Sequence, residues 1–227
     1  LERRILNLVR AGDEPETLRL MDQLYAENFV NRQLPLPLLR LFLFDLAGSL
    51  VKQAELLERV DPRVSDEMDG LFARMEANED PVAVFEHVRK LHAALCREFY
   101  ERKKSKNEDL KHSIINYIHS RYADPDLSLA SVAAHFQITE VYLPQFYKEQ
   151  TGVNFSDYLE NVRMEQARKL LLEGKLNINE IAQRVGYNSA NTFGRAFKRI
   201  HGVSATAFKQ SVADFGRLPR TDPMQNN

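Results

Sequence analysis

A repeat in the C-terminal half of the chain limits its fold more than any other feature. Residues of similar character recur there after 49 or 50 positions. The matched sets are Val132, Ala133, Phe136, Leu143, Tyr147, Lys148, Gly152 and Val153 in the first copy, and Ile181, Ala182, Val185, Phe193, Phe197, Lys198, Gly202 and Val203 in the second. The spacing changes by one within the set, so the second copy has one extra residue in its turn, where insertions are best tolerated. Two helix-turn-helix units have this pattern, and such a unit can hold a short helix in a groove of DNA.

The composition is that of an ordinary soluble chain. Its 227 residues are 44% hydrophobic and 28% charged, which suits one or two domains of usual size. The longest apolar stretch, residues 38–51, is interrupted by Arg40 and Asp45 and is too short to span a bilayer. The single Cys96 excludes an intrachain disulfide and suits a cytoplasmic location. The chain begins at Leu1 without a signal peptide, which leaves open a longer, membrane-anchored protein with further elements upstream.

Helical periodicity runs through almost the whole chain, and no segment alternates as a β-strand does. The predicted class is therefore all-α. The N-terminal half is expected to form five helices, over residues 1–10, 14–25, 38–60, 62–76 and 81–99. The charged run at residues 101–106 marks the predicted domain boundary, and a solvated helix face or linker is favoured there over a phosphate-binding arm. Asn107 is expected to begin the next helix, because its side chain can cap exposed N–H groups.

Seven helices are predicted between residues 107 and 213, followed by a flexible tail at 214–227. They lie over residues 107–122, 128–136, 139–150, 154–172, 177–185, 189–201 and 204–212. Ser128, Thr139 and Ser189 are expected to cap three of them. Gly186 is expected in the turn of the second copy, because glycine adopts a positive φ at little cost. Gln137 has the corresponding place in the first copy, where a left-handed conformation costs more.

Residues 110–210 resemble the DNA-binding domain of AraC/XylS-type transcription regulators. The resemblance is strongest at residues 178–187 and 193–199 of the second copy and at residues 129–136 of the first. Matching positions also include Tyr142, Leu143, Tyr147 and Lys148, and, in the connecting helix, Tyr158, Leu159, Arg163 and Ala167. The resemblance implies a domain of two helix-turn-helix units joined by a long helix, placed after an N-terminal helical domain.

The function that this resemblance implies is that of a bacterial, sequence-specific DNA-binding transcription regulator, an activator rather than an enzyme. Its recognition helices, at about 139–150 and 189–201, would enter successive major-groove segments of double-stranded promoter or operator DNA. No cofactor is implied. A protein-interaction or signal-relay module that has lost DNA binding stays open as an alternative, because the net charge of −1 is close to neutral.

The residues expected at the DNA are carried over by position from the family. Those expected to contact bases are Glu140, Val141, Pro144, Gln145, Ala190, Asn191, Thr192 and Arg195. Those expected to contact phosphates are Thr139, Lys148, Ser189, Lys198 and Arg199. Arg195 suits guanine and Asn191 or Gln145 suits adenine through paired hydrogen bonds, while Val141 and Ala190 suit a thymine methyl group. In each case a merely solvated helix surface is the alternative.

Pro144 is the main departure from a regular recognition helix. It lies about one turn into the predicted helix, where a proline removes an N–H group and costs up to about 3 kcal/mol. The first recognition helix is therefore expected either to be kinked there or to recognise DNA less precisely, and the second helix is expected to contribute more of the base recognition. Ala205, which replaces a proline usual in the family, should matter little because alanine favours helix.

Other chemistry is sparse. His87 and His92 do not share a helical face, and no carboxylate or thiol completes a metal site with His112 and His119, so surface or half-buried histidines are expected and no metal. Cys96 lies in an apolar helical stripe and is interpreted as a core thiol. An enzyme that uses Cys96, as in repair proteins with a similar DNA-binding half, is kept as an alternative. No small-molecule site is predicted.

The N-terminal half resembles, more weakly, the helical segment before the DNA-binding domain in large membrane-anchored regulators of Gram-positive bacteria. This implies signal relay or dimerisation, with a homodimer through residues 1–106, and leaves open a contact with RNA polymerase. The apolar stretch at residues 38–51 is either a surface for a partner or plain core.

Overall fold

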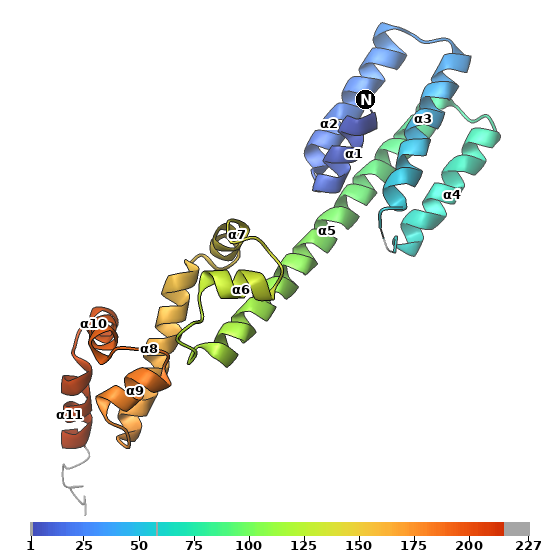
Figure 1. Ribbon diagram of the computed structural model, residues 1–227. Coiled ribbons are helices and arrows are strands. Elements are labelled where there is room, and N and C mark those ends of the chain that lie inside the picture. The colour runs from blue at the N-terminus through green and yellow to red at the C-terminus, as the bar shows by residue number, and fades with distance from the viewer. Residues whose placement is uncertain (1, 58, 216–227) are drawn as a thin grey trace, which may run out of the picture. The chain divides into compact units, whose positions relative to one another are not determined.

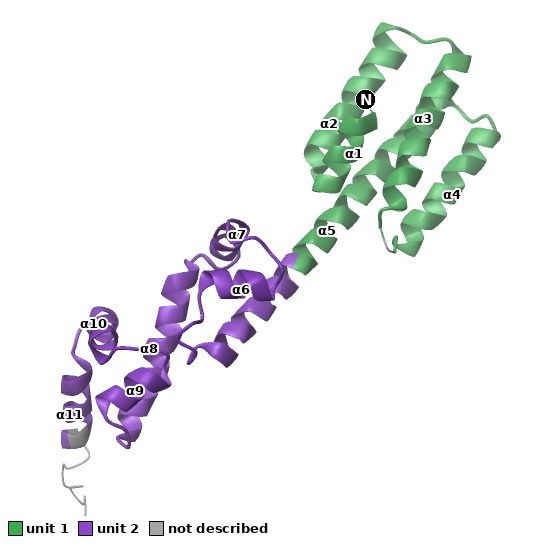
Figure 2. Ribbon diagram, in the orientation of Figure 1, with its two compact units in different colours: residues 1–106 green, residues 107–227 purple. Residues whose placement is uncertain are grey.

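The computed structural model describes residues 2–57 and 59–215. It divides into two compact units, residues 1–106 (unit 1) and residues 107–227 (unit 2), shown in Figure 2. Helices are the only regular secondary structure in these ranges, which confirms the all-α class. None of the helices described is both long enough and apolar enough to cross a membrane.

Unit 1 consists of five helices and a short π-helical segment, with the first part of α5 among α1 to α4 (Figure 1). The elements are α1 (Glu2–Ala11), α2 (Glu14–Tyr25), η1 (Ala26–Asn31), α3 (Leu36–Ala54), α4 (Pro62–Glu76) and α5 (Pro81–Arg121). Capping side chains explain where α2 and α4 begin. Asp13 accepts a hydrogen bond from the N–H of Glu16, at 3.1 Å, and Asp61 caps α4 in the same manner. The predicted helices are found, although α3 ends six residues before Val60.

The core of unit 1 holds α3 and α5 parallel in one register. The rings of Phe42 and Phe85 stack with centroids 6.4 Å apart, and two turns later Ser49 Oγ lies 2.9 Å from His92 Nε2. Both pairs are 43 positions apart, so the two helices run in the same direction. Cys96, one turn beyond His92, is buried and its Sγ donates to Thr17 Oγ1 at 3.2 Å. Cys96 is thus a core thiol, as predicted.

His92 corrects the expectation that the histidines lie at the surface or half-buried. It is fully buried, because it follows Val88 by one turn on the inner stripe of α5. Its Nδ1 donates to the carbonyl of Val88 at 2.9 Å, and its Nε2 faces Ser49 Oγ. Burial lowers the pKa of His92 from 6.5 to about 4, so the ring is neutral at pH 7.

The predicted helix start at Asn107 is wrong. α5 continues without interruption from Pro81 to Arg121 and contributes residues to both units. The run at 101–106 contains no glycine or proline, and its Glu, Arg and Lys residues favour helix, so nothing ends the helix there. Most of these side chains are exposed, which agrees with a solvated helix face.

Within residues 107–215, unit 2 contains seven helices, as predicted. They are the last part of α5, then α6 (Leu129–His135), α7 (Tyr142–Thr151), α8 (Phe155–Glu173), α9 (Ile178–Arg184), α10 (Ala190–His201) and α11 (Ala205–Phe215). Ser128 caps α6, and Asn177 caps α9 in a reciprocal pair with Glu180. Of the predicted flexible tail, residues 214 and 215 belong to α11 and the rest lies outside the described residues.

The two helix-turn-helix units have separate cores that share α8. The first half of α8 contributes Phe155, Leu159 and Val162 to the core of α6 and α7, and its second half packs against α9 and α10. The side chains of this second half are Met164, Ala167 and Leu171. With 19 residues, α8 is about 28 Å long. It therefore connects the two cores and also sets the distance between them.

Titration of His92 should make the stability of unit 1 depend on pH. The unfolded chain takes up a proton with the ordinary pKa near 6.5, whereas the folded chain resists protonation down to about 4. The contribution of neutral His92 to the free energy of unfolding is fully present above pH 6.5. It should be lost as the pH falls toward 4, by about 1.4 kcal/mol per pH unit at most. Urea denaturation followed by circular dichroism across this range measures it. The His92→Gln variant should lose this dependence, and His112→Gln, at an exposed residue, should retain it.

Candidate nucleic-acid interface

The first recognition helix begins later than predicted. α7 starts at Tyr142 rather than at residue 139, and Thr139 anchors the turn before it. Thr139 Oγ1 accepts the N–H of Tyr142 at 3.1 Å, and the Thr139 carbonyl accepts those of Tyr142 and Leu143. Pro144 is therefore the third residue of α7, where a missing N–H group costs little because the first turn has few intrahelical acceptors. The premise of the expected kink, a proline in the interior of the helix, is therefore wrong.

The second recognition helix is more regular. α10 begins at Ala190, after Ser189, and the Ser189 carbonyl accepts the N–H of Phe193 at 3.0 Å. Ser189 occupies the N-cap position, but its hydroxyl makes no capping hydrogen bond, so the predicted side-chain cap is not formed. The α10 sequence contains four basic or titratable side chains near its end and no acidic residue. α10 is thus the more positive of the two helices.

The predicted DNA-contacting side chains lie on the outward faces of α7 and α10 and in the turns that precede these helices. On the inward faces, Leu143, Phe146 and Tyr147 of α7 and Phe193, Ala196 and Phe197 of α10 are buried. Ala190 is half-buried, and Val141 is 86% exposed. The other exposed members are Thr139, Glu140, Pro144, Gln145, Lys148, Ser189, Asn191, Thr192, Arg195, Lys198 and Arg199.

Three of these side chains already have partners within unit 2, and the first is Thr139, which accepts the N–H of Tyr142. Gln145 Nε2 donates to Glu149 Oε1 at 2.9 Å, one turn along α7. Arg199 forms an ion pair with Glu160 of α8, and the hydrogen bond with this carboxylate raises the Arg199 pKa. No local pattern in the sequence points to Glu160, because its partner lies 39 positions away. Arg199 therefore also ties α10 to the connecting helix.

The turns of the two units differ as the sequence predicts. Gln137 has φ of 55° in the first turn, and Gly186 has φ of 86° in the second. The backbone at Gly186 also approaches other parts of unit 2 closely. A Cβ atom there would lie 2.6 Å from the carbonyl oxygen of Tyr122 and 3.0 Å from Arg163 Nε. Gly186 is needed for space as well as for its backbone conformation.

Arg163 of α8 joins the two helix-turn-helix units. Its Nε donates to the Tyr122 carbonyl at 2.8 Å and its Nη2 to the Asp124 carbonyl at 2.7 Å, both in the segment that follows α5. Its guanidinium also lies 5.6 Å from the ring centroid of Tyr187, next to Gly186 in the second turn. Burial lowers the pKa of Arg163 and raises that of Tyr187 to about 12.

Comparison with known proteins shows what this unit is. A family model described as a helix-turn-helix domain matches residues 132–211. An uncharacterized HTH-type transcriptional regulator of Escherichia coli, YpdC, is 38% identical over 95 residues, which are 42% of this chain and 33% of that protein. The Msm operon regulatory protein of Streptococcus mutans is 28% identical over 180 residues, 73% of this chain and 64% of that protein. Residues 132–211 form an AraC/XylS-type helix-turn-helix domain.

A solved structure is also similar to about half of this chain. The C-terminal domain of AraT, a response regulator from Geobacillus stearothermophilus, is 34% identical, covers 52% of this chain and 94% of that chain, and has a TM-score of 0.45. The chain spans a third of the length of YpdC and under two thirds of the Msm regulator. In the part of the chain that the structure describes, no group of three or more His, Cys, Asp or Glu residues could hold a metal ion.

The position of Pro144 in the AraC/XylS-type domain predicts a small effect of its removal. Pro144→Ala should change the free energy of unfolding of unit 2 by less than about 1 kcal/mol, because the first turn tolerates proline. Lys148→Pro, one turn further into α7, should cost about 3 kcal/mol or more. Urea denaturation compares them. A large stabilisation by Pro144→Ala would show that the proline strains the helix after all.

The close approach at Gly186 gives a second prediction for this domain. Gly186→Ala should destabilise unit 2 by about 1–3 kcal/mol more than Gly202→Ala. Both glycines have a positive φ, but a Cβ at Gly202 would meet nothing within 4 Å. The difference between the two free energies of unfolding thus isolates the contact with Tyr122 and Arg163. Equal losses would mean that only the backbone conformation matters.

Proposed function

We propose that this protein is a sequence-specific DNA-binding transcription regulator that places α7 and α10 in successive major-groove segments. The observation that carries the proposal is the outward presentation of polar and basic side chains on two helices of an AraC/XylS-type domain, held by one connecting helix. The names of the relatives, among them an operon regulatory protein, support the assignment to transcription. A fixed separation of the helices is what recognition of one continuous duplex requires.

We assign the main base recognition to α10. Arg195 and Asn191 are exposed on its outward face and can each form paired hydrogen bonds, with guanine and adenine respectively. Thr192 and Ala190 complete this set. Just before α7, Val141 has a large exposed apolar surface suited to a thymine methyl group.

The other base contacts of α7 are proposed to be weaker. The Gln145 amide is shared with Glu149, and Glu140 adds a negative charge near the DNA phosphates. Pro144 contributes only apolar contact, since it has no N–H group to donate. The difference between the two helices therefore follows from charge and hydrogen bonding rather than from a kink.

Phosphate contacts are proposed for Thr139, Lys148, Ser189, Lys198 and Arg199. The Ser189 hydroxyl is not used as a cap, which leaves it for a phosphate. Glu160 accepts a hydrogen bond from Nη2 of Arg199, and a guanidinium has five N–H donors in all. Arg199 can thus bind a phosphate while Glu160 holds it in place.

Several broader expectations remain part of this proposal. They are activation of transcription in the bacterial cytoplasm, a contact with RNA polymerase, and signal relay or homodimerisation through residues 1–106; the membrane anchor of a longer protein also stays a prediction. We propose no catalytic role for Cys96. It is fully buried, and burial raises its pKa, so the reactive thiolate is disfavoured.

Replacement of Arg195 tests the assignment of α10. Arg195→Ala should weaken binding to the preferred site by about 1 to 3 kcal/mol and relax the preference at one base pair, since a bidentate contact is lost. Selection of sites from a randomised duplex library, followed by anisotropy titrations at several salt concentrations, measures both effects. The matched control is Arg168→Ala, on α8, where the arginine pairs with Glu165.

Two outcomes would count against the proposal. An unchanged base preference in Arg195→Ala would remove that residue from base recognition. Failure of the parent chain to bind any duplex at low salt would favour the protein-interaction module, because phosphate contacts strengthen as salt is lowered.

A further inference from the structure

The outer face of α3 carries apolar side chains that the core does not use. Leu43, Leu46 and Leu50 pack into unit 1, whereas Leu41 is 60% exposed and Phe44 50% exposed. The apolar stretch at residues 38–51 is therefore core on one side of α3 and uncovered on the other. Large exposed apolar residues gathered on one helix face are typical of an interaction surface.

The side chains along this face are self-complementary in an antiparallel arrangement. Leu41, Asp45, Gly48, Lys52 and Leu56 follow one another at intervals of three or four residues, so the first four share one side of α3 and Leu56 is exposed just beyond its end. The two leucines and the two charges have the same midpoint, between residues 48 and 49. A second copy of α3 laid antiparallel across that midpoint meets opposite charge at each charge and leucine at each leucine.

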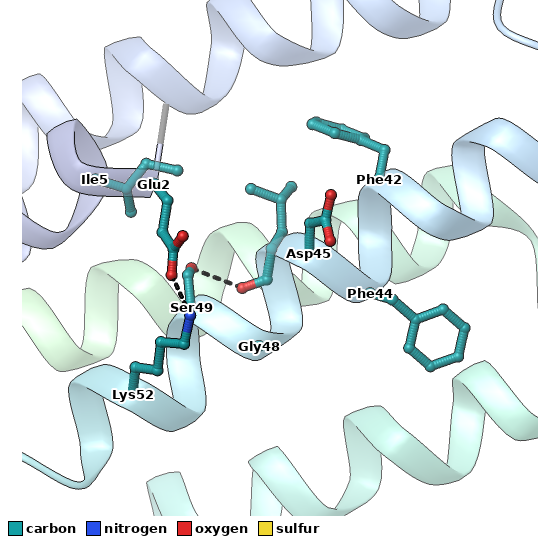
Figure 3. A pocket seen from close by; sticks show the side chains of 9 residues that line it. Glu2, Ile5, Phe42, Phe44, Asp45, Gly48, Ser49 and Lys52 are labelled. Carbon is teal, nitrogen blue, oxygen red and sulfur yellow. Dashed lines mark hydrogen bonds and ion pairs between the residues drawn. The ribbon is translucent and has the colours of Figure 1, made fainter.

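Gly48, at the centre of this face, has no role in the packing of unit 1. It lies within α3, where glycine costs about 1 kcal/mol relative to alanine, and a Cβ atom there would meet nothing within 4 Å. Gly48 lines a hollow of about 320 Å³. Figure 3 shows the Glu2–Lys52 pair toward one end of this hollow and Phe44 toward the other, with Gly48 between them. A bare backbone in a hollow permits the close approach of another helix.

We propose that this face of α3 is a homodimer interface, in which α3 of a second copy packs antiparallel across Gly48. Asp45 then lies against Lys52 of the second copy and Leu41 against its Leu56, each contact occurring twice about the two-fold axis. Lys52 already pairs with Glu2 of its own chain at 2.5 Å, so it bridges two carboxylates in the dimer. The inference rests on the proposed dimerisation through residues 1–106 and names its surface.

Replacement of Gly48 can separate a loss of dimerisation from a loss of folding, because it should abolish the dimer without lowering the thermal stability of the chain. Gly48→Gln in the 227-residue chain should leave thermal stability unchanged or raise it, because glutamine favours helix and has open space, yet it should abolish the dimer measured by sedimentation velocity over a concentration series. Gly70→Gln is the matched control: Gly70 lies within α4 and is equally free of contacts, and its replacement should leave the dimer intact.

Charge reversal tests the antiparallel arrangement. Asp45→Lys and Lys52→Glu should each raise the dimer dissociation constant by about tenfold, since each creates two like-charge contacts. The double variant restores both pairs and should recover most of the affinity.

The outcomes separate this surface from the functions proposed above. A monomeric parent chain at all concentrations overturns both the dimer and its surface. A dimer that persists in Gly48→Gln, or a double charge variant no better than the single ones, overturns the surface alone and leaves dimerisation to another face of unit 1. DNA binding of the same variants, followed by anisotropy, reports independently on unit 2.

Discussion

The arrangement of the C-terminal unit depends on the contacts of one guanidinium. Arg163 donates to two carbonyls that follow α5 and lies over the ring of Tyr187 in the second turn, where Gly186 leaves room for it. Arginine stays charged even when half-buried, and its planar group satisfies two acceptors while stacking on an aromatic ring. It thereby fixes both helix-turn-helix units to the midpoint of α8. Two recognition helices can act on one duplex only if their separation is held in this way.

The recognition helices are alike in fold but differ in chemistry. Each helix buries three residues and exposes the opposite face. However, α10 contains only neutral and basic residues, whereas α7 contains Glu149 and is preceded by Glu140. Pro144 lies in the first turn of α7, where a proline is tolerated, because the helix begins as late as Tyr142. The repeat thus provides two copies of one support on which the contact surfaces have diverged.

Unit 1 uses polar contacts inside and leaves apolar surface outside. The buried Ser49–His92 contact forms only in the register that α3 and α5 adopt, and the buried Cys96–Thr17 contact joins α5 to α2. Buried polar pairs restrict alternatives in this way, because a shifted register would leave their groups without partners. The opposite face of α3 carries exposed leucines and the bare Gly48, and we propose this face as the surface for a second copy.

The amino-acid sequence alone determined the class, the two units of the repeat, the helix cap at Ser128, and the inward and outward faces of α7 and α10. These features depend on periodicity and on hydrogen bonds between residues at most four apart, so they are visible in a short window of sequence. Only the tertiary structure decided the burial of His92, the pairing of Arg199 with Glu160 and the contacts of Arg163. Those residues meet partners about 40 positions away, and which partners they meet depends on the packing of whole helices rather than on any local pattern.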